Sequence, residues 1–350
     1  MYDETRDWIT ANWDESITLR EWWARMLAAR LSFPRWPTEW FGRDCSQRDQ
    51  NDIAQAFGDA DVLSAPTGLG VLMGAPVTMT YGTQDQKQRW LPSLADGTEG
   101  WCQLFSEPGA GSDLGGLSTR AELDGDRYII NGQKVWCSGG RYSNWGILMA
   151  RTNPEAAKHD GISFFLFPMN LPGVEVRPLR QMTGEAEFDE VFFTDVELPA
   201  DHLLGPLHGG WGVGMAVLTS ERGHIGTSVI GLDRRLEAMA RLAEGRELGT
   251  VERDRLTRLL ATGQAYKAMA RRQGPIASTA ASLMKLGITE MMFETAMLRA
   301  ELAGADSMLD GPESFGMLQA PGGRIAGGTS QVQRNIIGER LLGLPREPKG

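Results

Sequence analysis

FSEPGAGSD, at residues 105–113, is the stretch that decides the fold of this 350-residue chain. Its two glycines stand beside Ser112 and Asp113, so backbone N–H groups can approach an acceptor-rich ligand closely, with hydroxyl groups as further donors. A Gly-Ser-Asp tripeptide alone is typical of an ordinary surface turn. A second element, NGQKVWCSGG at residues 131–140, adds a tryptophan beside a hydroxyl group and two glycines. That combination offers a stacking face and a hydrogen bond to a planar heterocycle.

Around these two stretches, residues 99–205 show the short period of β-strands. The dipeptides Asp124-Gly125 and Asn131-Gly132 predict two tight turns. Strand-like runs lie at residues 128–130, 135–136, 162–167, 174–176 and 191–193. Short strands at this spacing favour a compact β-sandwich or barrel over βαβ units.

The flanking regions are helical in pattern. Long segments at 211–245, 250–272 and 276–304 are rich in Ala, Leu, Met and Arg. A last helix is expected after Thr329, where Ser330 and Gln333 can form a capping box. The sequence therefore predicts an α+β protein with a helical N-domain at 1–98, a β domain at 99–205 and a helical C-domain at 206–350.

Composition excludes several classes of protein. A net charge of −10 argues against a nucleic-acid platform. The three cysteines are scattered and have no partners at metal-ligand spacing, which indicates reduced thiols in a cytoplasmic protein without a metal. No run of about 18 apolar residues predicts a membrane span. The run TGLGVLMG at residues 67–74 is not a dinucleotide loop, because its third glycine falls one position late.

Four segments, taken together, resemble the acyl-CoA dehydrogenase family over nearly the whole chain. They are SEPGAGSD, NGQKVWCSGG, the run FDEVFFTDVELPADHLLG that closes the β domain, and the terminal GGTSQVQRNIIGERLLGLPR. The resemblance implies a helical N-domain, a β domain and a C-terminal four-helix bundle. It also implies FAD as cofactor, α,β-dehydrogenation of an acyl-CoA to the trans-2-enoyl-CoA, and an electron-transfer flavoprotein as the acceptor.

The resemblance also implies cofactor contacts. The residues expected to bind FAD are Phe105, Ser106, Gly111, Ser112, Trp136, Ser138, Thr329 and Gln331. Trp136 would flank the isoalloxazine ring, Ser138 would stand near flavin N5, and Ser112 would also face the CoA. Core packing is the alternative for Trp136, and a role at the helix start is the alternative for Gln331. We expect FAD between the β domain and the C-domain helices.

Removal of the α-proton needs a carboxylate in a desolvated pocket. Most family members place this glutamate just before the final Gly-Thr, where this chain has Gly327. Members of the isovaleryl type place it on an earlier helix, before an arginine, and the matching pair here is Glu221-Arg222. We therefore expect Glu221 to be the base and Arg222 to order the pocket and bind substrate. A surface role for Glu221 stays open, with Glu187 or Glu313 as the base.

The chain departs from the family pattern in the C-domain. The Arg-x-x-Phe-Gly and Gln-x-x-Gly-Gly segments, which in the family reach the FAD of a neighbouring subunit, are replaced by the sequences at 244–249 and 303–308. Arg246 is left as a candidate for a pyrophosphate contact. We expect a homo-oligomer, as dimer or tetramer, or a heteromer with a sister subunit. An acyl-CoA oxidase and a non-catalytic or half-site subunit are the alternative functions.

Overall fold

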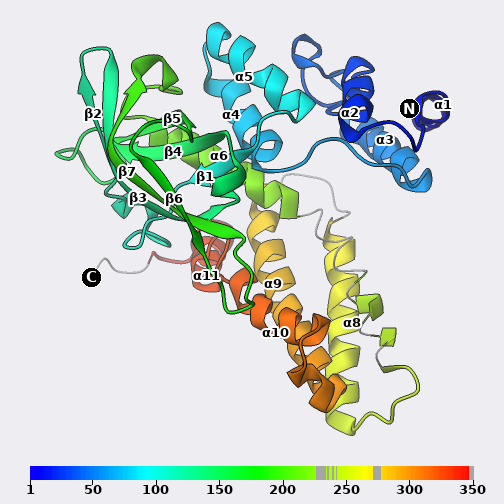
Figure 1. Cartoon of the computed structure of the whole chain (residues 1–350). Coiled ribbons are helices and arrows are strands. Elements are labelled where there is room, and N and C mark those ends of the chain that lie inside the picture. The colour runs from blue at the N-terminus through cyan, green and yellow to red at the C-terminus, as the bar shows by residue number, and fades with distance from the viewer. Residues whose placement is uncertain (226–233, 235, 239, 242, 271–276, 347–350) are drawn as a thin grey trace. The chain divides into compact units, whose positions relative to one another are not determined.

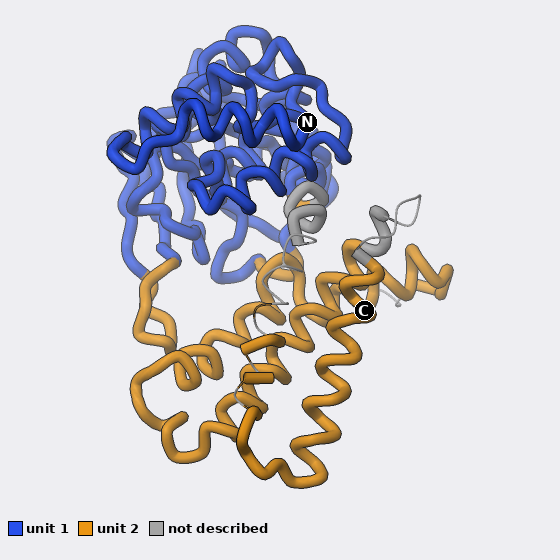
Figure 2. Tube along the Cα trace, turned by 90° about the vertical axis from the view of Figure 1, so that its right-hand side faces the viewer, with its two compact units in different colours: residues 1–110, 114–178, 188–217 blue, residues 111–113, 179–187, 218–350 orange. Residues whose placement is uncertain are grey.

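A computed structural model describes the chain except for residues 226–233, 235, 239, 242, 271–276 and 347–350. The side chains at 219–225, 270 and 277–280 also lie outside the described part. Figure 2 colours the two compact units into which the chain divides. Unit 1 comprises residues 1–110, 114–178 and 188–217, and unit 2 comprises residues 111–113, 179–187 and 218–350.

Unit 1 begins with the helices that the sequence predicts. They are α1 (Tyr2–Asn12), α2 (Leu19–Ala28), α3 (Gln47–Asp59), α4 (Ala75–Tyr81) and α5 (Gln84–Asp96), with a π-helical turn at Gly70–Gly74 before α4. Capping boxes at Thr18, Ser46 and Thr83 begin α2, α3 and α5, because each side chain accepts an amide N–H that the first turn leaves free. Trp22 is fully buried in the core of the first three helices.

The rest of unit 1 is built on one seven-stranded sheet (Figure 1). Its strands are β1 (Trp101–Leu104), β2 (Arg120–Asp124), β3 (Arg127–Ser138), β4 (Trp145–Arg151), β5 (Ile162–Pro168), β6 (Val174–Leu179) and β7 (Phe188–Pro199). The order is β1-β4-β2-β3-β7-β6, with β5 paired to β4. β4 and β5 are buried along almost their whole length, so they form the centre of the core.

One of the two predicted turns is wrong. Asp124-Gly125 does connect β2 to β3, because Asp124 pairs with Arg127 across the hairpin. Asn131-Gly132 instead lies inside β3, where the pairing with β7 shifts register between Ile130 and Gly132. Gly132 has a φ of +148°, and a Cβ there would lie 2.5 Å from the Thr119 hydroxyl oxygen. The glycine therefore serves a bulge and a close approach, and the strand continues.

Unit 2 is mainly helical in the part of the chain that the structure describes. α6 (Gly210–Ile225) leads into it, and α8 (Thr250–Ala270), α9 (Ala277–Ala303), α10 (Pro312–Gly323) and α11 (Ser330–Ile336) follow, with a π-helical turn at Ile337–Leu341. Met284, Ile288 and Met291 on α9 form its core with Leu236 and Leu298.

The predicted cap of the last helix is wrong by one residue. The N-cap of α11 is Thr329, whose hydroxyl accepts the Val332 N–H at 3.2 Å. Ser330 is already the first helical residue, and Gln333 donates to the Gly327 carbonyl instead. Gly327 and Gly328 have φ of +65° and +96°, so the turn before the cap needs the left-handed region that glycine adopts freely.

No helix of the described residues is long and apolar enough to cross a membrane.

Candidate active site

Trp136 projects out of the sheet at a second irregularity of β3. The pairing with β7 shifts register between Lys134 and Cys137, and Trp136 takes a φ of +62°, which is uncommon for a side chain of this size. Its neighbours in sequence, Val135 and Cys137, are buried, whereas Trp136 is 55% exposed. Its aromatic neighbour among the described residues is Phe188, whose ring lies at 82° to the indole with 5.8 Å between centroids. Trp136 is therefore not a core-packing residue, and its indole is a free flat surface.

Two serine hydroxyls lie at strand ends, one after β1 and one at the end of β3, the strand that carries Trp136. Ser106 follows β1 and is half-buried, and Ser138 ends β3 and is exposed. Within the described residues, neither hydroxyl has a hydrogen-bond partner. Phe105, in contrast, is 3% exposed and packs edge-on against Phe164, so its ring is not available to a ligand.

A buried carboxylate, that of Asp189, fixes the loop that follows Ser138. Asp189 of β7 is fully buried, accepts the Arg141 backbone N–H at 3.0 Å and pairs with the Arg141 guanidinium at 3.2 Å. Gly139 has a φ of +62° and begins the short 3-10 turn that contains Arg141. The loop thus holds Ser138 at a defined edge of the sheet.

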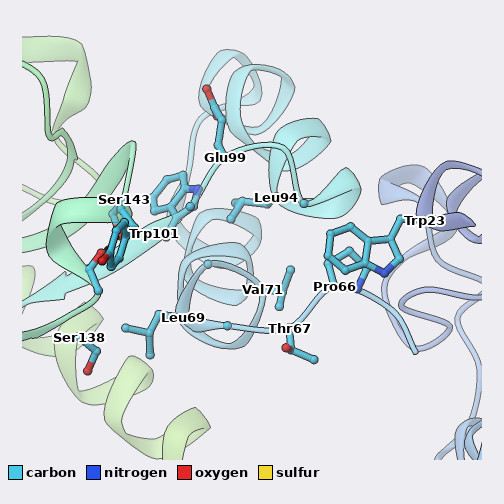
Figure 3. A pocket seen from close by; sticks show the side chains of 16 residues that line it. Trp23, Pro66, Thr67, Leu69, Val71, Leu94, Glu99, Trp101, Ser138 and Ser143 are labelled. Atoms are coloured by element: carbon cyan, nitrogen blue, oxygen red, sulfur yellow. Dashed lines mark hydrogen bonds between the residues drawn. The ribbon is translucent and has the colours of Figure 1, made fainter. Parts of the chain in front are cut away.

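A cavity of about 270 Å³ opens beside Ser138 in unit 1. Figure 3 shows Ser138 and Leu69 at one end of it and Trp23 and Pro66 at the other. Trp101 forms part of the wall between them. The lining is mostly aromatic, aliphatic and glycine: Trp23, Pro66, Thr67, Gly68, Leu69, Gly70, Val71, Leu94, Gly97, Glu99, Gly100, Trp101, Ser138, Gly139, Tyr142 and Ser143.

The backbone of the cavity wall explains its shape. A Cβ at Gly70 would lie 2.7 Å from a Leu94 methyl carbon and 2.9 Å from the Trp101 ring. The π-helical turn can therefore pack against Trp101 only with glycine at that position. A Cβ at Gly139 would meet nothing within 4 Å. The wall at Trp101 is thus closely packed, whereas the backbone at Gly139 has free space beside it.

Sequence reasoning missed a buried ion pair close in sequence to Ser106 and Trp136, between Glu107 and Lys134. The Lys134 ammonium is fully buried and donates to the Glu107 carboxylate at 2.8 Å and to the Phe105 carbonyl at 3.0 Å. Burial would raise the pKa of the Glu107 carboxyl, but the Lys134 charge and the hydrogen bonds that Glu107 accepts lower this pKa to about 2. Burial lowers the pKa of Lys134, and Glu107 opposes that shift. Both side chains belong to the quoted motifs, yet they meet only because β3 packs beside the segment that follows β1.

The buried thiols near the site are poor nucleophiles. Burial raises the pKa of Cys102 to about 12 and that of Cys137 well above its usual value. Because the thiolate is the reactive form, neither group is suited to covalent catalysis. In the described residues, no group of three or more His, Cys, Asp or Glu side chains is arranged to hold a metal ion.

The remaining candidate residues for FAD belong to unit 2. Gly111 and Ser112 are exposed, and so is Gln331 in the first turn of α11. Thr329 uses its hydroxyl as the helix cap. α9 fixes this turn: the Lys285 ammonium, 1% exposed as a residue, donates to the Gly328 carbonyl at 2.6 Å. Sequence reasoning did not identify this anchor, since a lysine 43 residues earlier carries no signal.

Glu221 and Arg222, the expected base and its partner, lie on the α6 backbone, but their side chains are outside the described residues. The two alternative glutamates are described. Glu187 is exposed, and Glu313 is paired with Arg299 at 2.9 Å. Arg246, the candidate for a pyrophosphate contact, donates to the Leu302 carbonyl. Neither alternative glutamate is a desolvated carboxylate free of a cation.

Family models of known proteins match almost the whole chain. Three family models match: the acyl-CoA dehydrogenase N-terminal domain at residues 3–98, the middle domain at 102–196 and the C-terminal domain at 208–342. Acyl-CoA dehydrogenase IpdE1 of Mycobacterium tuberculosis is 38% identical over 344 residues, which cover 95% of this chain and 89% of that protein.

Two solved structures have the same fold. The Tcur3481-Tcur3483 steroid ACAD matches with a TM-score of 0.81 at 26% identity, over 99% of this chain and 94% of that one. The ChsE4-ChsE5 complex from Mycobacterium tuberculosis matches with a TM-score of 0.76 at 27% identity, over 99% and 97%. The predicted order of helical N-domain, β domain and C-terminal helices is confirmed.

Proposed function

The chain belongs to the acyl-CoA dehydrogenase family, and on this premise we propose which residues carry the reaction and on what kind of acyl group. The protein is an acyl-CoA dehydrogenase, an FAD-dependent oxidoreductase. FAD, when bound, accepts the hydrogen that leaves the β-carbon of the acyl group. The chain's own residues must bind the ring, take the α-proton and admit the acyl group.

The observation that supports the flavin site best is the exposed Trp136 on its bulge. A flat indole in a strained backbone conformation is typical of a functional position. Among the described residues the hydroxyls of Ser106 and Ser138 have no partner, and they are suited to the polar edge of a flavin. These groups fit FAD. We assign further contacts along the cofactor to Phe105, Gly111, Ser112, Thr329 and Gln331. That of Phe105 would use backbone atoms other than its carbonyl, which accepts from Lys134.

In this proposal Glu221 removes the α-proton of the thioester and Arg222 orders the base and the substrate. The support is chemical, because Gly327 stands at the other position that the family uses and has no side chain. The proton passes to the Glu221 carboxylate as the β-hydrogen leaves with its electron pair. Water must be excluded around Glu221 for its carboxylate to be basic enough. Ser112 is assigned to the CoA part.

The cavity beside Ser138 is proposed as the site of the acyl group beyond the reacting carbons. Its tryptophan and glycine lining favours a broad apolar group, since flat rings pack well against indoles. One structural relative is described as a steroid ACAD. We therefore propose a cyclic, steroid-derived acyl-CoA as substrate, with Trp23 and Pro66 limiting its length.

The route of the electrons and the assembly are also proposals. An electron-transfer flavoprotein is the expected acceptor in the cytoplasm, and an acyl-CoA oxidase would instead release hydrogen peroxide in air. The altered segments at 244–249 and 303–308 favour a heteromer with a sister subunit, and one relative in structure is the ChsE4-ChsE5 complex. The proposed domain limits at residues 98 and 205 can be tested by limited proteolysis.

Anaerobic titration with a panel of acyl-CoAs tests the function. The yellow protein should be bleached by acyl-CoAs with ring-bearing acyl groups and less readily by straight-chain ones of similar size. A colourless protein that binds CoA without FAD would favour the non-catalytic subunit. Bleaching by straight chains alone would contradict the substrate class and leave the reaction intact.

A further inference from the structure

The Glu107–Lys134 pair joins three segments of unit 1. Lys134 reaches from β3 to the end of β1, where it bonds Glu107 and the Phe105 carbonyl. The Glu107 carboxylate also accepts the Ser118 N–H at 2.6 Å, the Ser118 hydroxyl at 2.7 Å and the Thr119 N–H at 2.9 Å. Both carboxylate oxygens and the ammonium are thus engaged, although both side chains are almost completely withdrawn from water.

The same contacts fix the backbone that carries the proposed flavin residues. Lys134 holds the Phe105 carbonyl, and the Val135 N–H donates to the Ser106 carbonyl at 2.9 Å. Two successive carbonyls therefore turn toward β3, and the Ser106 hydroxyl is left without a partner among the described residues. Trp136 follows two residues after Lys134 on the bulge. The ion pair is therefore linked to the backbone next to Ser106 and next to Trp136.

Stability alone does not account for this arrangement. Removing two charges from water is unfavourable, and apolar pairs of similar volume often stabilise a protein as well or better. Charge-assisted hydrogen bonds do provide short, directional links between chain segments. A buried pair with every oxygen engaged is therefore suited to holding backbone groups in fixed directions.

We propose that Glu107 and Lys134 are positioning residues for FAD, which set the directions of Ser106 and Trp136 without touching the cofactor. This inference rests on the assignment of those two residues to the flavin site. The ammonium restrains the end of β1 through the Phe105 carbonyl, and the carboxylate restrains the ammonium. Loss of the charges should loosen the ring site even in a chain that folds stably.

The test separates positioning from stability with three variants. Lys134→Met leaves a buried carboxylate unpaired and should lower the melting temperature. Lys134→Met/Glu107→Gln removes both charges, and the glutamine oxygen can still accept both Ser118 donors, while its amide nitrogen faces the Thr119 N–H. Part of the stability lost in Lys134→Met should therefore return. Ile53→Val removes one methyl group from the N-terminal helices and serves as a destabilised control far from the pair.

We expect the double variant to bind FAD at least about tenfold more weakly than wild type, the effect of one lost hydrogen bond to a charged group. The visible spectrum and reduction potential of its bound FAD should also shift, and those of Ile53→Val should not. Wild-type affinity, spectrum and potential in the double variant would overturn the proposal. If the double variant does not fold, Glu107→Gln carries the same measurements and the same two outcomes. A wild-type protein that binds no FAD would instead refute the flavin site itself.

Discussion

A glutamate that removes a proton beside a thioester must be more basic than a surface carboxylate, and Glu221 is our assignment. Glu221→Gln keeps the size of the side chain and removes the base. The rate of flavin reduction should fall by about 10²–10⁴, as is typical of lost general-base catalysis. Stopped-flow absorbance with a good acyl-CoA measures this rate, and FAD content should be unchanged.

Glu237→Gln is the matched control, because Glu237 is exposed and pairs only weakly with Arg241 at 3.9 Å. Its reduction rate should equal that of wild type. A Glu221→Gln variant that is reduced at the wild-type rate would move the base elsewhere, and Glu187 and Glu313 would be the next to substitute. Glu313 would first have to leave Arg299.

Trp136 is the second prediction at this scale. Trp136→Ala should weaken FAD binding by about two- to tenfold, since an aromatic stacking contact is worth about 0.5–1.5 kcal/mol beyond the area it buries. Equilibrium titration of the stripped protein with FAD measures the effect. Trp36→Ala, which removes a tryptophan stacked on Phe33 in the N-terminal region, should leave the affinity unchanged. Equal losses in both variants would indicate general destabilisation instead.

Residue patterns predicted some of the site and missed the rest for a physical reason. An indole followed by a hydroxyl and two glycines could be identified locally, because the group that meets the ligand lies on one short stretch. The Glu107–Lys134 pair could not, since its partners are 27 residues apart and meet only when β3 lies beside the end of β1. Phe105 was predicted to bind the flavin, and the sequence did not indicate that its ring is buried against Phe164.

At the scale of elements, the bulges of β3 were harder to predict than the strand. The residues on both sides of Asn131-Gly132 alternate as a strand does, and the dipeptide by itself indicates a hairpin turn. Pairing with β7 over almost the whole length of β3 overrides that local preference. The cap of α11 shows the same limit on a smaller scale, because Thr329 and Ser330 are both good caps and only the Gly327–Gly328 turn selects the first.

Because of the Glu107–Lys134 ion pair, we expect the free energy of unfolding to depend on pH in the acid range. The pKa of Glu107 is about 2 in the folded chain, below its ordinary value of 4.5. A carboxyl with a lowered pKa stabilises the fold above its unfolded pKa, and this stabilisation is lost as the pH falls from about 4.5 toward 2. The urea midpoint of wild type should therefore fall more steeply in this window than that of Glu107→Gln.

Glu197→Gln is the control for the pH series. Glu197 is exposed and pairs with Arg127 at the surface, so water screens the interaction and its loss should change the midpoint little. Parallel slopes for wild type and Glu107→Gln between pH 4.5 and 2 would show that the buried pair does not couple folding to protonation.

For the whole molecule, the helix and strand patterns of the sequence were enough to predict the order of its helical and β regions. The alternation of helix, strand and helix patterns predicted the three regions that the family models match. The oligomeric assembly is harder to predict, because in a single chain a surface that contacts another chain is recognised only by its exposed apolar side chains. Unit 2 exposes several: Met308, Leu309, Ile325, Leu342 and Leu344. α10 has no fully buried residue, although it contains Phe315, Met317 and Leu318.

We therefore expect the protein to be an oligomer, with unit 2 contacting a second chain. Adjacent exposed apolar side chains such as Met308 and Leu309 are typical of interfaces, since burying them against a partner is favourable. Leu309→Asp, 65% exposed in the single chain, should shift the sedimentation coefficient toward that of a monomer and lower FAD content. Leu123→Asp, 58% exposed on β2 of unit 1, should do neither. A wild-type monomer with full FAD at micromolar concentration would contradict the expectation. Higher FAD content on co-expression with a sister subunit would identify the assembly as a heteromer, because the missing C-domain segments would then be supplied by the other chain.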